Sequence, residues 1–294
     1  MINAASHAGP PAFTGGLASP AGRIAVLLPV YNGEQQLRGT LDSLAGQGVP
    51  FTVVVVDDGS TTPVAVDPPY PGCPVHVVRL ERNGGIERAL NAGLAHIARL
   101  GFEFVARLDC GDRCLPERLA RQLGFLDAHP DVTLVGSDVE WQTADGRAAF
   151  RLRPPTDHAA IVRALPHTLY LIHPAVMMRT AAVLAAGGYR YDTPAAEDYD
   201  LFWRMARRGR VANLPETLLV AHYDPAGISL RRRRRQLVTT LRIRLRAFQA
   251  GEPACWIGVA KAVAFLATPP SAIRVAKRLV RGAAPRSAAR GAPA

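Results

Sequence analysis

The sequence has few cysteines and no long apolar run, and these two shortages exclude several classes of protein. Four cysteines in 294 residues are too few and too unevenly spaced for a disulfide framework or a four-thiolate zinc site, which makes a reducing cytoplasm the simplest compartment. Residues 1–20 contain no charged segment followed by an apolar run, so we expect a disordered tail and no signal peptide. The apolar stretch at residues 254–267 is interrupted by Lys261 and is too short to cross a bilayer.

The overall composition is that of a soluble globular protein. Hydrophobic residues make up 48% of the chain and charged residues 20%, and the 26 glycines and 24 prolines follow no repeat. The composition therefore excludes a wholly disordered, a collagen-like or a polytopic membrane protein. The length allows one large α/β domain with extensions or two small domains.

Positive charge is concentrated near the carboxyl end. The whole chain has a formal net charge of +11, but residues 231–294 hold 15 arginines and lysines against one acid, Glu252, a net of +14. The rest of the chain holds 20 basic and 23 acidic side chains, a net of −3. We therefore expect a nearly neutral domain at residues 21–230 and a basic, partly amphipathic and helical extension at residues 231–294.

Short apolar runs alternate with amphipathic helical patterns in the first half of the chain. Four runs are predicted as strands: residues 24–30, 51–56, 75–79 and 104–108. Helical spacing follows the first run at residues 35–45 and the third at residues 86–97. This alternation predicts an α/β fold with a doubly wound, mostly parallel sheet and helices on both faces. In such sheets, ligands bind beyond the carboxyl ends of the strands.

Polar loops follow three of these strands, and each loop has two interpretations. The segment Asp-Asp-Gly-Ser at residues 57–60 is either an ordinary turn or a source of a carboxylate that binds a base or ribose. Tyr31, after the first strand, either packs in the fold or stacks on a base. Asp109 and Asp112 either cap the next helix or hold a divalent metal that bridges a diphosphate. The residues alone leave these alternatives open.

A further pair of acids, Glu197 and Asp198, opens a predicted helix. Acids are favoured at this position by capping and by the helix dipole, which is a sufficient explanation for the pair alone. The same dipole is expected to lower the pKa of Asp198, which keeps it ionised but makes it a weaker base, and desolvation by a bound acceptor would offset this effect.

The order and spacing of these segments together resemble glycosyltransferase family 2. The resemblance covers about residues 23–230 and leaves out the basic extension. It rests on these segments: Pro29-Val30-Tyr31-Asn32-Gly33-Glu34, Val54-Val55-Val56-Asp57-Asp58-Gly59-Ser60, Arg82-Asn83-Gly84-Gly85, Arg107-Leu108-Asp109, Pro116-Glu117-Arg118-Leu119, His173-Pro174, Gly187-Gly188-Tyr189 and Glu197-Asp198-Tyr199-Asp200-Leu201.

The resemblance implies a GT-A fold, a nucleotide-diphospho-sugar donor, a divalent cation (Mn²⁺ or Mg²⁺) and transfer with inversion at the anomeric carbon. By the same resemblance, Asp198 is the general base, with Glu197 as its neighbour. Tyr31 would lie against the nucleotide base, and Asp58 would hold the base or ribose. The implied nucleotide-sugar-binding residues are Val30, Tyr31, Glu34, Asp58, Asn83, Arg88 and Asp109.

One departure from the family pattern concerns the metal. The family's Asp-X-Asp motif falls on residues 109–111, where Gly111 replaces the second aspartate and offers no side-chain ligand. Asp109 is the implied metal ligand, and Asp112 either substitutes for the missing aspartate or leaves Asp109 as the only protein carboxylate at the metal.

The basic extension also has two interpretations. It either lies on an anionic membrane surface as an amphipathic segment or forms a solvated, charged helix that closes over the domain. We expect peripheral membrane contact through residues 231–294 at the cytoplasmic face of the inner membrane. We expect no nucleic-acid partner, because the sequence offers no readout element.

The sequence therefore predicts an inverting glycosyltransferase that moves a sugar from a nucleotide-sugar donor to a saccharide or lipid-linked acceptor, in cell-surface polysaccharide or lipopolysaccharide biosynthesis. A catalytically inactive relative that binds a nucleotide sugar or a partner is one alternative, and a polyanion-binding protein acting through the extension is another. A nucleotidyltransferase or a Rossmann dehydrogenase fits less well, because no Gly-X-Gly-X-X-Gly follows a strand and the pair Glu197-Asp198 would have no role.

Overall fold

The computed structural model describes residues 12–13, 21–66, 73–143, 145–223 and 233–268. Of the tail expected to be disordered, only Ala12–Phe13 is described, as the short strand β1, and the rest of residues 1–20 lies outside these ranges. Residues 231–232 and 269–294 of the extension also lie outside them.

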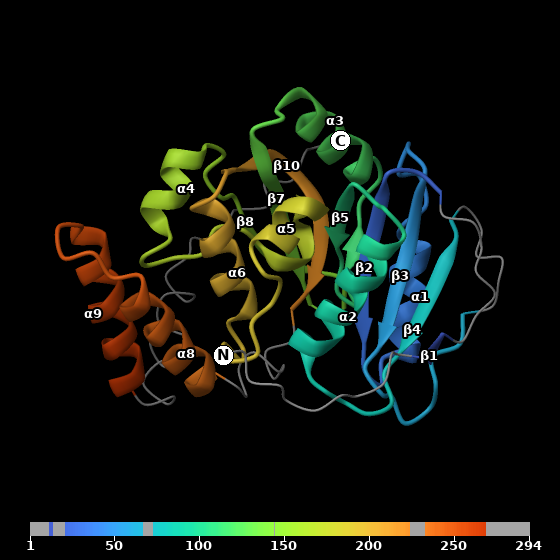
Figure 1. Ribbon diagram of the computed structural model, residues 1–294, viewed down its shortest axis with the longest axis horizontal. Helices are drawn as coiled ribbons and strands as arrows, with labels where there is room; N and C mark the ends of the chain where they lie inside the picture. Colours follow the sequence, from blue (N-terminus) through green and yellow to red (C-terminus); the bar gives the residue numbers. More distant parts are fainter. Residues whose placement is uncertain (1–11, 14–20, 67–72, 144, 224–232, 269–294) are drawn as a thin grey trace, which may run out of the picture.

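One mixed, curved sheet forms the centre of the molecule (Figure 1). The strands follow the order β1-β4-β3-β2-β5-β9-β7-β10-β6, with β8 paired to β7. The longer strands are β2 (Ile24–Val30), β3 (Phe51–Asp57), β4 (Val75–Arg79), β5 (Phe104–Arg107), β7 (Val132–Gln142) and β10 (Arg210–His222). The shorter ones are β6 (Arg113–Cys114), β8 (Ala148–Leu152) and β9 (Met177–Arg179).

Most of the sheet is parallel, as the sequence predicts. β2 pairs in parallel with β3 and β5, β3 with β4, and β7 with β10. The short β9 is antiparallel to both β5 and β7, so the six longer strands all run in the same direction. Their carboxyl ends therefore meet at one edge of the sheet, where the polar loops are expected to gather.

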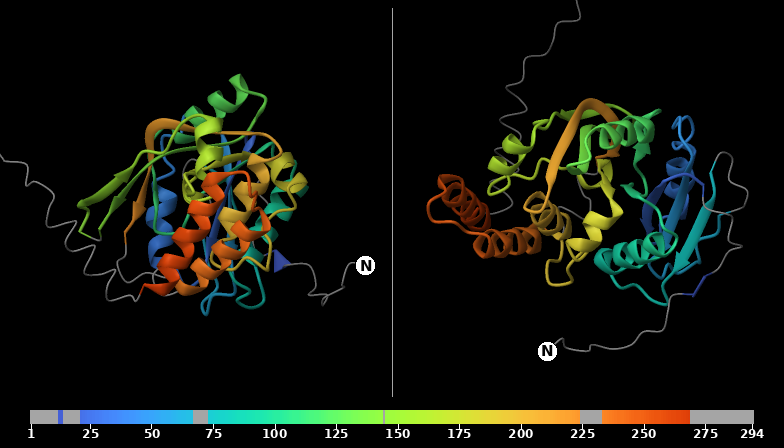
Figure 2. Two further views of the ribbon diagram at one scale, coloured as in Figure 1. Left: turned by 90° about the vertical axis from the view of Figure 1, so that its left-hand side faces the viewer. Right: turned by 45° about the horizontal axis from the view of Figure 1, so that its top comes forward.

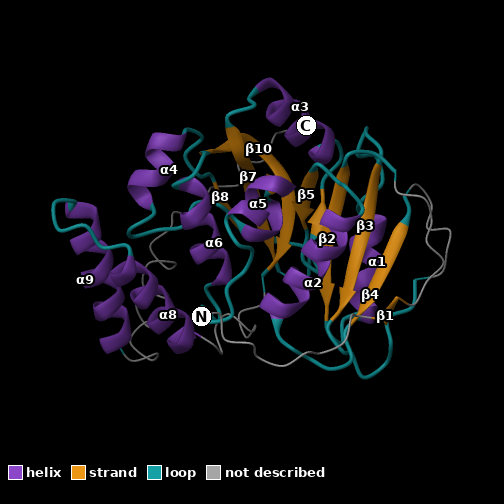
Figure 3. Cartoon of the chain, in the orientation of Figure 1, coloured by secondary structure: helices purple, strands orange, loops and turns teal. Residues whose placement is uncertain are grey.

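Helices cover both faces of the sheet (Figure 3). The described helices are α1 (Glu34–Asp42), α2 (Ile86–Arg99), α3 (Arg118–Ala128), α4 (His158–Ala164), α5 (Thr180–Ala185), α6 (Glu197–Ala206), α8 (Arg233–Arg246) and α9 (Pro253–Ala267), with the 3₁₀ turn η1 (His173–Ala175). Leu41 of α1 and Leu119 of α3 belong to one buried apolar cluster. Leu90 of α2, Val183 of α5 and Phe202 of α6 belong to a second cluster.

The two clusters lie on opposite faces of the strands. Every residue of β2 is buried, and successive side chains of a strand point to opposite faces. Accordingly, Val26 and Leu28 join the first cluster, whereas Ala25 and Leu27 join the second. A strand covered on both faces reads as a continuous apolar run, which is why this element was predictable from sequence.

The loops after β3 and β4 are held close together by a glycine. Gly59 has a φ of +69°, and a Cβ atom at this position would lie 2.4 Å from the carbonyl carbon of Arg82. Only a residue without a side chain fits such an approach. The contact brings Asp58 against the backbone of the loop that precedes α2.

The described part of the basic extension is a pair of helices, α8 and α9, that packs beside α6 (Figure 2). Ile243 of α8 is buried in a small cluster with Ala196 and Tyr199. Arg244 of α8 donates hydrogen bonds to the hydroxyl oxygen of Tyr199 and to the carbonyl oxygen of Gly258 in α9. The extension is thus helical, as expected, and among the described residues no helix is both long and apolar enough to cross a membrane.

Candidate functional site

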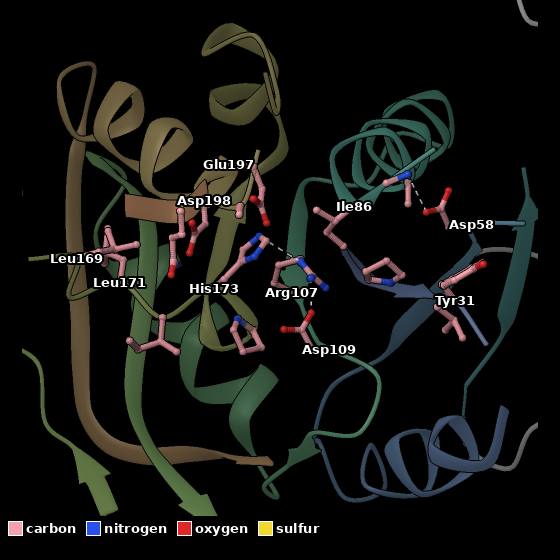
Figure 4. Close-up of a pocket in the computed structure, with 18 of the residues that line it drawn as sticks. Tyr31, Asp58, Ile86, Arg107, Asp109, Leu169, Leu171, His173, Glu197 and Asp198 are labelled. Atoms are coloured by element: carbon pink, nitrogen blue, oxygen red, sulfur yellow. Dashed lines mark hydrogen bonds and ion pairs between the residues drawn. The ribbon is translucent and has the colours of Figure 1, made fainter. Parts of the chain in front are cut away.

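A pocket of about 580 Å³ opens at the carboxyl ends of β2, β3 and β5 and extends to the start of α6 (Figure 4). Its walls come from both halves of the chain, and the described part of the extension adds one residue, Gln236 of α8. The residues that line it are Pro29, Val30, Tyr31, Asp58, Asn83, Gly85, Ile86, Ala89, Arg107, Asp109, Leu169, Leu171, Ile172, His173, Pro174, Ala195, Glu197, Asp198 and Gln236.

Tyr31 and Asp58 form one end of the pocket. The Tyr31 side chain follows β2 and is 53% exposed, so its ring is available for stacking. Asp58 is buried, and its two carboxylate oxygens accept hydrogen bonds from the backbone N–H groups of Gly84, at 2.8 Å, and Gly85, at 3.0 Å. Each oxygen keeps a further lone pair for a ligand donor. Burial raises the pKa of Asp58, against the lowering effect of these two N–H groups.

Asp57, the neighbour of Asp58, has a structural role. It is fully buried and accepts hydrogen bonds from the backbone N–H groups of Ser60, at 2.8 Å, and Val64, at 3.1 Å. It also forms an ion pair with Arg79 of β4. The two adjacent acids therefore have different roles, because Asp57 stabilises the turn and Asp58 lines the pocket.

Arg107, the last residue of β5, lies in the middle of the pocket and is 1% exposed. Its Nη1 donates to the carbonyl oxygens of Leu27, at 3.0 Å, and Leu108, at 2.6 Å. Its Nη2 forms an ion pair with Asp109. A buried guanidinium needs such a full set of partners, and this set fixes the position of Asp109.

The ion pair controls the protonation of Asp109. Burial alone would raise the pKa of Asp109, but the positive charge of Arg107 and the hydrogen bond from its guanidinium hold it below its usual value. Asp109 is therefore a carboxylate at neutral pH. It presents negatively charged oxygen atoms at the pocket wall, next to a fixed positive charge.

The side chains of His173 and Tyr189 form a hydrogen-bonded series with Arg107. The Nε of Arg107 lies 3.3 Å from the Nε2 of His173, and the Tyr189 hydroxyl lies 2.8 Å from the same nitrogen. Burial, followed by the charge of Arg107, lowers the pKa of His173 to about 3, so the ring is neutral. Asn91 of α2 bonds both the N–H and the carbonyl of Tyr189, at 2.9 and 2.7 Å. The series Asn91, Tyr189, His173 and Arg107 thus connects α2 to the pocket floor.

Glu197 and Asp198, at the start of α6, form the other end of the pocket. Asp198 accepts a hydrogen bond from the backbone N–H of Tyr199 at 2.7 Å. The Oε2 of Glu197 is buried and has no hydrogen-bond partner among the described residues. A buried, unpartnered carboxyl oxygen beside a pocket is a position where a ligand hydroxyl would remove an energetic cost.

The expectation of a lowered pKa for Asp198 is wrong. Burial raises the pKa of Asp198 to about 6, despite the N–H of Tyr199. Burial and the nearby Asp198 raise the pKa of Glu197 to about 8. The loss of water around these acids outweighs the helix dipole, and near neutral pH the pair holds about one proton.

In the Asp-X-Asp region, neither Gly111 nor Asp112 supplies a second carboxylate to the pocket wall. Gly111 has a φ of +99°, a left-handed conformation that an aspartate would adopt only under strain. Asp112 is buried and accepts a hydrogen bond from the backbone N–H of His222 at 3.0 Å. Burial and Asp109 raise the pKa of Asp112 to about 7. Among the described residues, no group of three or more histidine, cysteine or acidic side chains is placed to hold a metal ion.

The structure brings most of the residues expected from the sequence to one pocket. Those that line it are Val30, Tyr31, Asp58, Asn83, Asp109, Glu197 and Asp198, whereas Glu34, Arg88 and Asp112 do not. Arg88 packs on the loop before α2, where a Cβ on Gly84 would lie 2.3 Å from its Cδ. Glu34 opens α1.

Sequence reasoning missed two groups of pocket residues. Arg107 and His173 belong to the family motifs, but their role in the pocket was not predicted. A charged residue at the end of an otherwise apolar strand is the sequence signal that could have indicated Arg107. The apolar wall formed by Leu169 and Leu171 and the contribution of Gln236 carry no sequence signal, because they depend on how distant segments pack.

The chain is similar in sequence to known glycosyltransferases. A family model described as glycosyl transferase family 2 matches residues 25–185. The amylovoran biosynthesis glycosyltransferase AmsE of Erwinia amylovora is 35% identical over 201 residues, which cover 66% of this chain and 74% of that protein. The putative glycosyltransferase EpsE of Bacillus subtilis (strain 168) is 28% identical over 209 residues, 69% of this chain and 73% of that protein.

Solved structures resemble the fold. S. aureus TarS 1–349 in complex with UDP-GlcNAc has a TM-score of 0.63 at 22% identity, covering 82% of this chain and 72% of that one. The mannosyltransferase PcManGT from Pyrobaculum calidifontis, in complex with GDP-Man and Mn²⁺, has a TM-score of 0.58 at 20% identity, covering 88% and 80%. At these identities the likeness concerns the fold alone, and it confirms the expected GT-A architecture.

Proposed function

The chain belongs to glycosyltransferase family 2, and from this premise we propose that its pocket transfers a sugar from a nucleotide-diphospho-sugar to an acceptor hydroxyl with inversion at the anomeric carbon. The acceptor is a saccharide or a lipid-linked saccharide, and the setting is cell-surface polysaccharide or lipopolysaccharide biosynthesis on the cytoplasmic side. The relation to an amylovoran biosynthesis glycosyltransferase supports this setting.

The observation that carries the proposal is the distribution of charge along the pocket. Figure 4 shows Tyr31 and Asp58 at one end, Arg107 and Asp109 in the middle and Asp198 with its neighbour Glu197 towards the other end. A nucleotide diphospho-sugar has the same three parts in the same order, a base with ribose, a diphosphate and a sugar. A donor bound along the pocket in this order would have its reacting carbon near the carboxyl pair, and this match supports the proposal.

The reaction follows from these positions. The acceptor oxygen attacks the anomeric carbon while the bond from that carbon to the diphosphate oxygen breaks, and the electron pair leaves with the nucleoside diphosphate. Asp198 takes the proton of the acceptor hydroxyl. Its raised pKa, about 6, makes it a stronger base than an ordinary aspartate while leaving it mostly ionised at pH 7. Protonated Glu197 can donate a hydrogen bond to a sugar or acceptor oxygen.

A divalent cation fits this pocket with Asp109 as its protein ligand. Mg²⁺ and Mn²⁺ commonly use one or two carboxylates together with phosphate oxygens and water, so a single ionised carboxylate at the wall suffices. Bound there, the cation would neutralise charge on the leaving diphosphate. Asp112 accepts a backbone N–H and lies off the pocket wall, so we assign the ligand role to Asp109 alone.

The second candidate function is a catalytically inactive relative that binds a nucleotide sugar. The observation in its favour is Gly111, which leaves the Asp-X-Asp region with one carboxylate at the pocket. The carboxyl pair argues against this candidate, because two buried acids with raised pKa values in one pocket are typical of sites that transfer protons.

A thermal-shift panel tests donor binding. UDP-, GDP-, dTDP- and CDP-sugars are added to the purified protein with Mn²⁺, Mg²⁺ or EDTA. A ligand at 100 times its Kd stabilises by about 2.7 kcal/mol, which raises Tm by about 5 to 10 °C. We expect the sugars of one nucleotide class to raise Tm by this amount. Asp58→Asn should reduce that rise in Tm, whereas the control Asp131→Asn, at an exposed surface ion pair, should not. A folded protein that responds to no donor contradicts the proposal, and donor binding without transfer supports the inactive relative.

A further inference from the structure

Helix α9 has an unusual distribution of side chains. Its buried residues are small: Cys255, Gly258 and Ala262. Its exposed residues are Pro253, Trp256, Ile257, Ala260, Lys261, Val263, Ala264, Phe265 and Ala267, and only one of these is charged. We call this set the outer face of α9. An amphipathic helix of a water-soluble protein normally buries its large apolar side chains, so the outer face has the reverse pattern.

The exposed area is substantial. Trp256 is 58% exposed, Ile257 59%, Val263 50% and Phe265 40%. Single exposed apolar residues are ordinary on protein surfaces, but several large ones on one helix are typical of an interaction surface.

Packing prevents α9 from turning this face inward. A Cβ atom at Gly258 would lie 1.8 Å from the carbonyl oxygen of Pro166, so the small side of the helix is in direct backbone contact with the domain. Arg244 of α8 donates a hydrogen bond to the carbonyl oxygen of Gly258 at 2.7 Å. These contacts fix the rotation of α9 and leave Trp256, Ile257 and Val263 exposed, while Lys261, at the edge of the outer face, bonds back to the carbonyl oxygen of His167.

The outer face lies at the margin of the molecule. Figures 1 and 2 both show α9 as the outermost helix, with α8 between it and α6. A flat surface can therefore approach the outer face of α9 without meeting the sheet domain first.

Positive charge accompanies this apolar face. The guanidinium of Arg233 lies 5.7 Å from the ring centre of Phe265, and Arg234 and Arg235 follow in the same turn with exposed side chains. The extension from residue 231 has a net charge of +14, whereas the rest of the chain has −3. Apolar side chains flanked by cations complement the surface of an anionic bilayer.

The charge also disfavours a second copy of the chain as the occupant. In a twofold dimer, the same patch occurs on both partners, so the arginines at the start of α8 of both copies would enter one interface, where like charges repel. A bilayer that contains anionic lipid has the opposite charge and accommodates the aromatic and aliphatic side chains at the level of its headgroups.

We propose that the outer face of α9, with the arginines at the start of α8, docks on an anionic lipid bilayer and holds the pocket next to the bilayer surface. Gln236 lines the pocket, and Arg233, which covers Phe265, precedes it by about one helical turn. Leu169 and Leu171 form an apolar pocket wall on the side of Asp198 (Figure 4). Resting on the proposed transferase function, this placement favours a lipid-linked acceptor.

The test is a vesicle-binding assay with the full chain. Phosphatidylcholine vesicles with and without phosphatidylglycerol are sedimented with wild-type protein and with Trp256→Gln/Ile257→Gln and Arg234→Gln/Arg235→Gln variants. We expect binding only to the phosphatidylglycerol vesicles, weakened by salt, and a loss of about tenfold or more in each variant. The matched control is Leu184→Gln, at a 46% exposed leucine of α5, which should bind as the wild type does.

Several results would overturn the proposal. The first is no binding of the full chain to either vesicle, as expected if residues 269–294 or a second copy cover the face. Equal binding by Trp256→Gln/Ile257→Gln and wild type is the second. Light scattering that shows a wild-type dimer, converted to a monomer by the same variant, would assign the face to self-association.

Activity separates this proposal from the proposed function. The apolar variant should lose transfer to an acceptor embedded in phosphatidylglycerol vesicles by about tenfold, while hydrolysis of the donor in solution stays unchanged. A chain that binds vesicles but neither transfers nor hydrolyses the donor would leave the docking intact and contradict the transferase function. An equal loss of transfer and of donor hydrolysis would show that the double substitution damages the fold. The same comparison is then made with Val263→Gln, at another exposed residue of the outer face.

Discussion

Replacing Glu197 by glutamine should make the protein more stable at high pH and change it little at low pH. Burial and Asp198 raise the pKa of Glu197 from 4.5 to about 8 in the folded protein. Between these values the folded state holds a proton that the unfolded chain releases. The stability of the wild type therefore falls as pH rises from about 4.5 to about 8.

The size of the effect follows from the same shift. A tenfold change in proton affinity is worth about 1.4 kcal/mol, so the change from 4.5 to about 8 has an upper limit of ~5 kcal/mol. The pocket is open to water, which screens the charge, and water entering beside a newly ionised carboxyl relieves part of the cost. We therefore expect Glu197→Gln to gain about 2 kcal/mol at pH 9 and close to nothing at pH 5.

Urea unfolding at pH 5, 7 and 9 measures this difference. Glu216→Gln is the matched control, because Glu216 is a surface glutamate in an exposed ion pair with Arg121 and should show no such pH-dependent gain. A gain that is equal at pH 5 and pH 9 would refute the reasoning. A wild type that is more stable than Glu197→Gln at pH 9 would show that Glu197 is stabilised as an ion.

Two further predictions concern glycines. In Gly258→Ala the new Cβ would lie 1.8 Å from the carbonyl oxygen of Pro166, so the free energy of unfolding in urea should fall by about 1 to 3 kcal/mol. Gly251→Ala is the control, because its Cβ would meet nothing within 4 Å, and its stability should not fall. Equal stability of the two variants would contradict the packing of α9 against the domain. Gly111→Asp restores the family pattern but occupies a φ of +99°, so it should lower Tm by several degrees without tightening metal-dependent donor binding; unchanged Tm with tighter binding would show that the loop accepts a second ligand.

The central strands could be predicted from sequence because they are buried on both faces. Every residue of β2 and β3 is buried, and the runs are apolar except for Thr52 and the terminal Asp57 of β3, so the positions of both strands follow from the apolar pattern. β10 was not predicted, because Pro215 and Glu216 interrupt its apolar pattern. The structure places a register shift between Leu214 and Thr217, which lets the strand continue past these two residues along β7.

The site could be predicted to the extent that its residues lie in motifs at strand ends. Tyr31, Asp58 and Asp109 each follow a strand of the parallel sheet, and the sheet brings those ends together. The roles of His173 and Tyr189 depend on a contact between distant loops. No local pattern in the sequence encodes the 2.8 Å contact between their side chains.

The pKa of Asp198 shows a limit of local reasoning. The helix start predicts a lowered pKa, and that effect is visible in the hydrogen bond from Tyr199. The raised value depends on the depth of the pocket and on Asp109, neither of which can be inferred from the helix sequence. Burial must be known before the sign of such a shift can be assigned.

The most direct test of the transferase account is the rate of sugar transfer by Asp198→Asn, with donor binding measured on the same protein. Asparagine keeps the size of the side chain and removes the base. We expect turnover to fall by about 10³-fold, within the range for loss of a positioned base, while the thermal shift with the donor stays close to that of the wild type. Near-normal turnover with intact donor binding would contradict the assignment of Asp198 as the base.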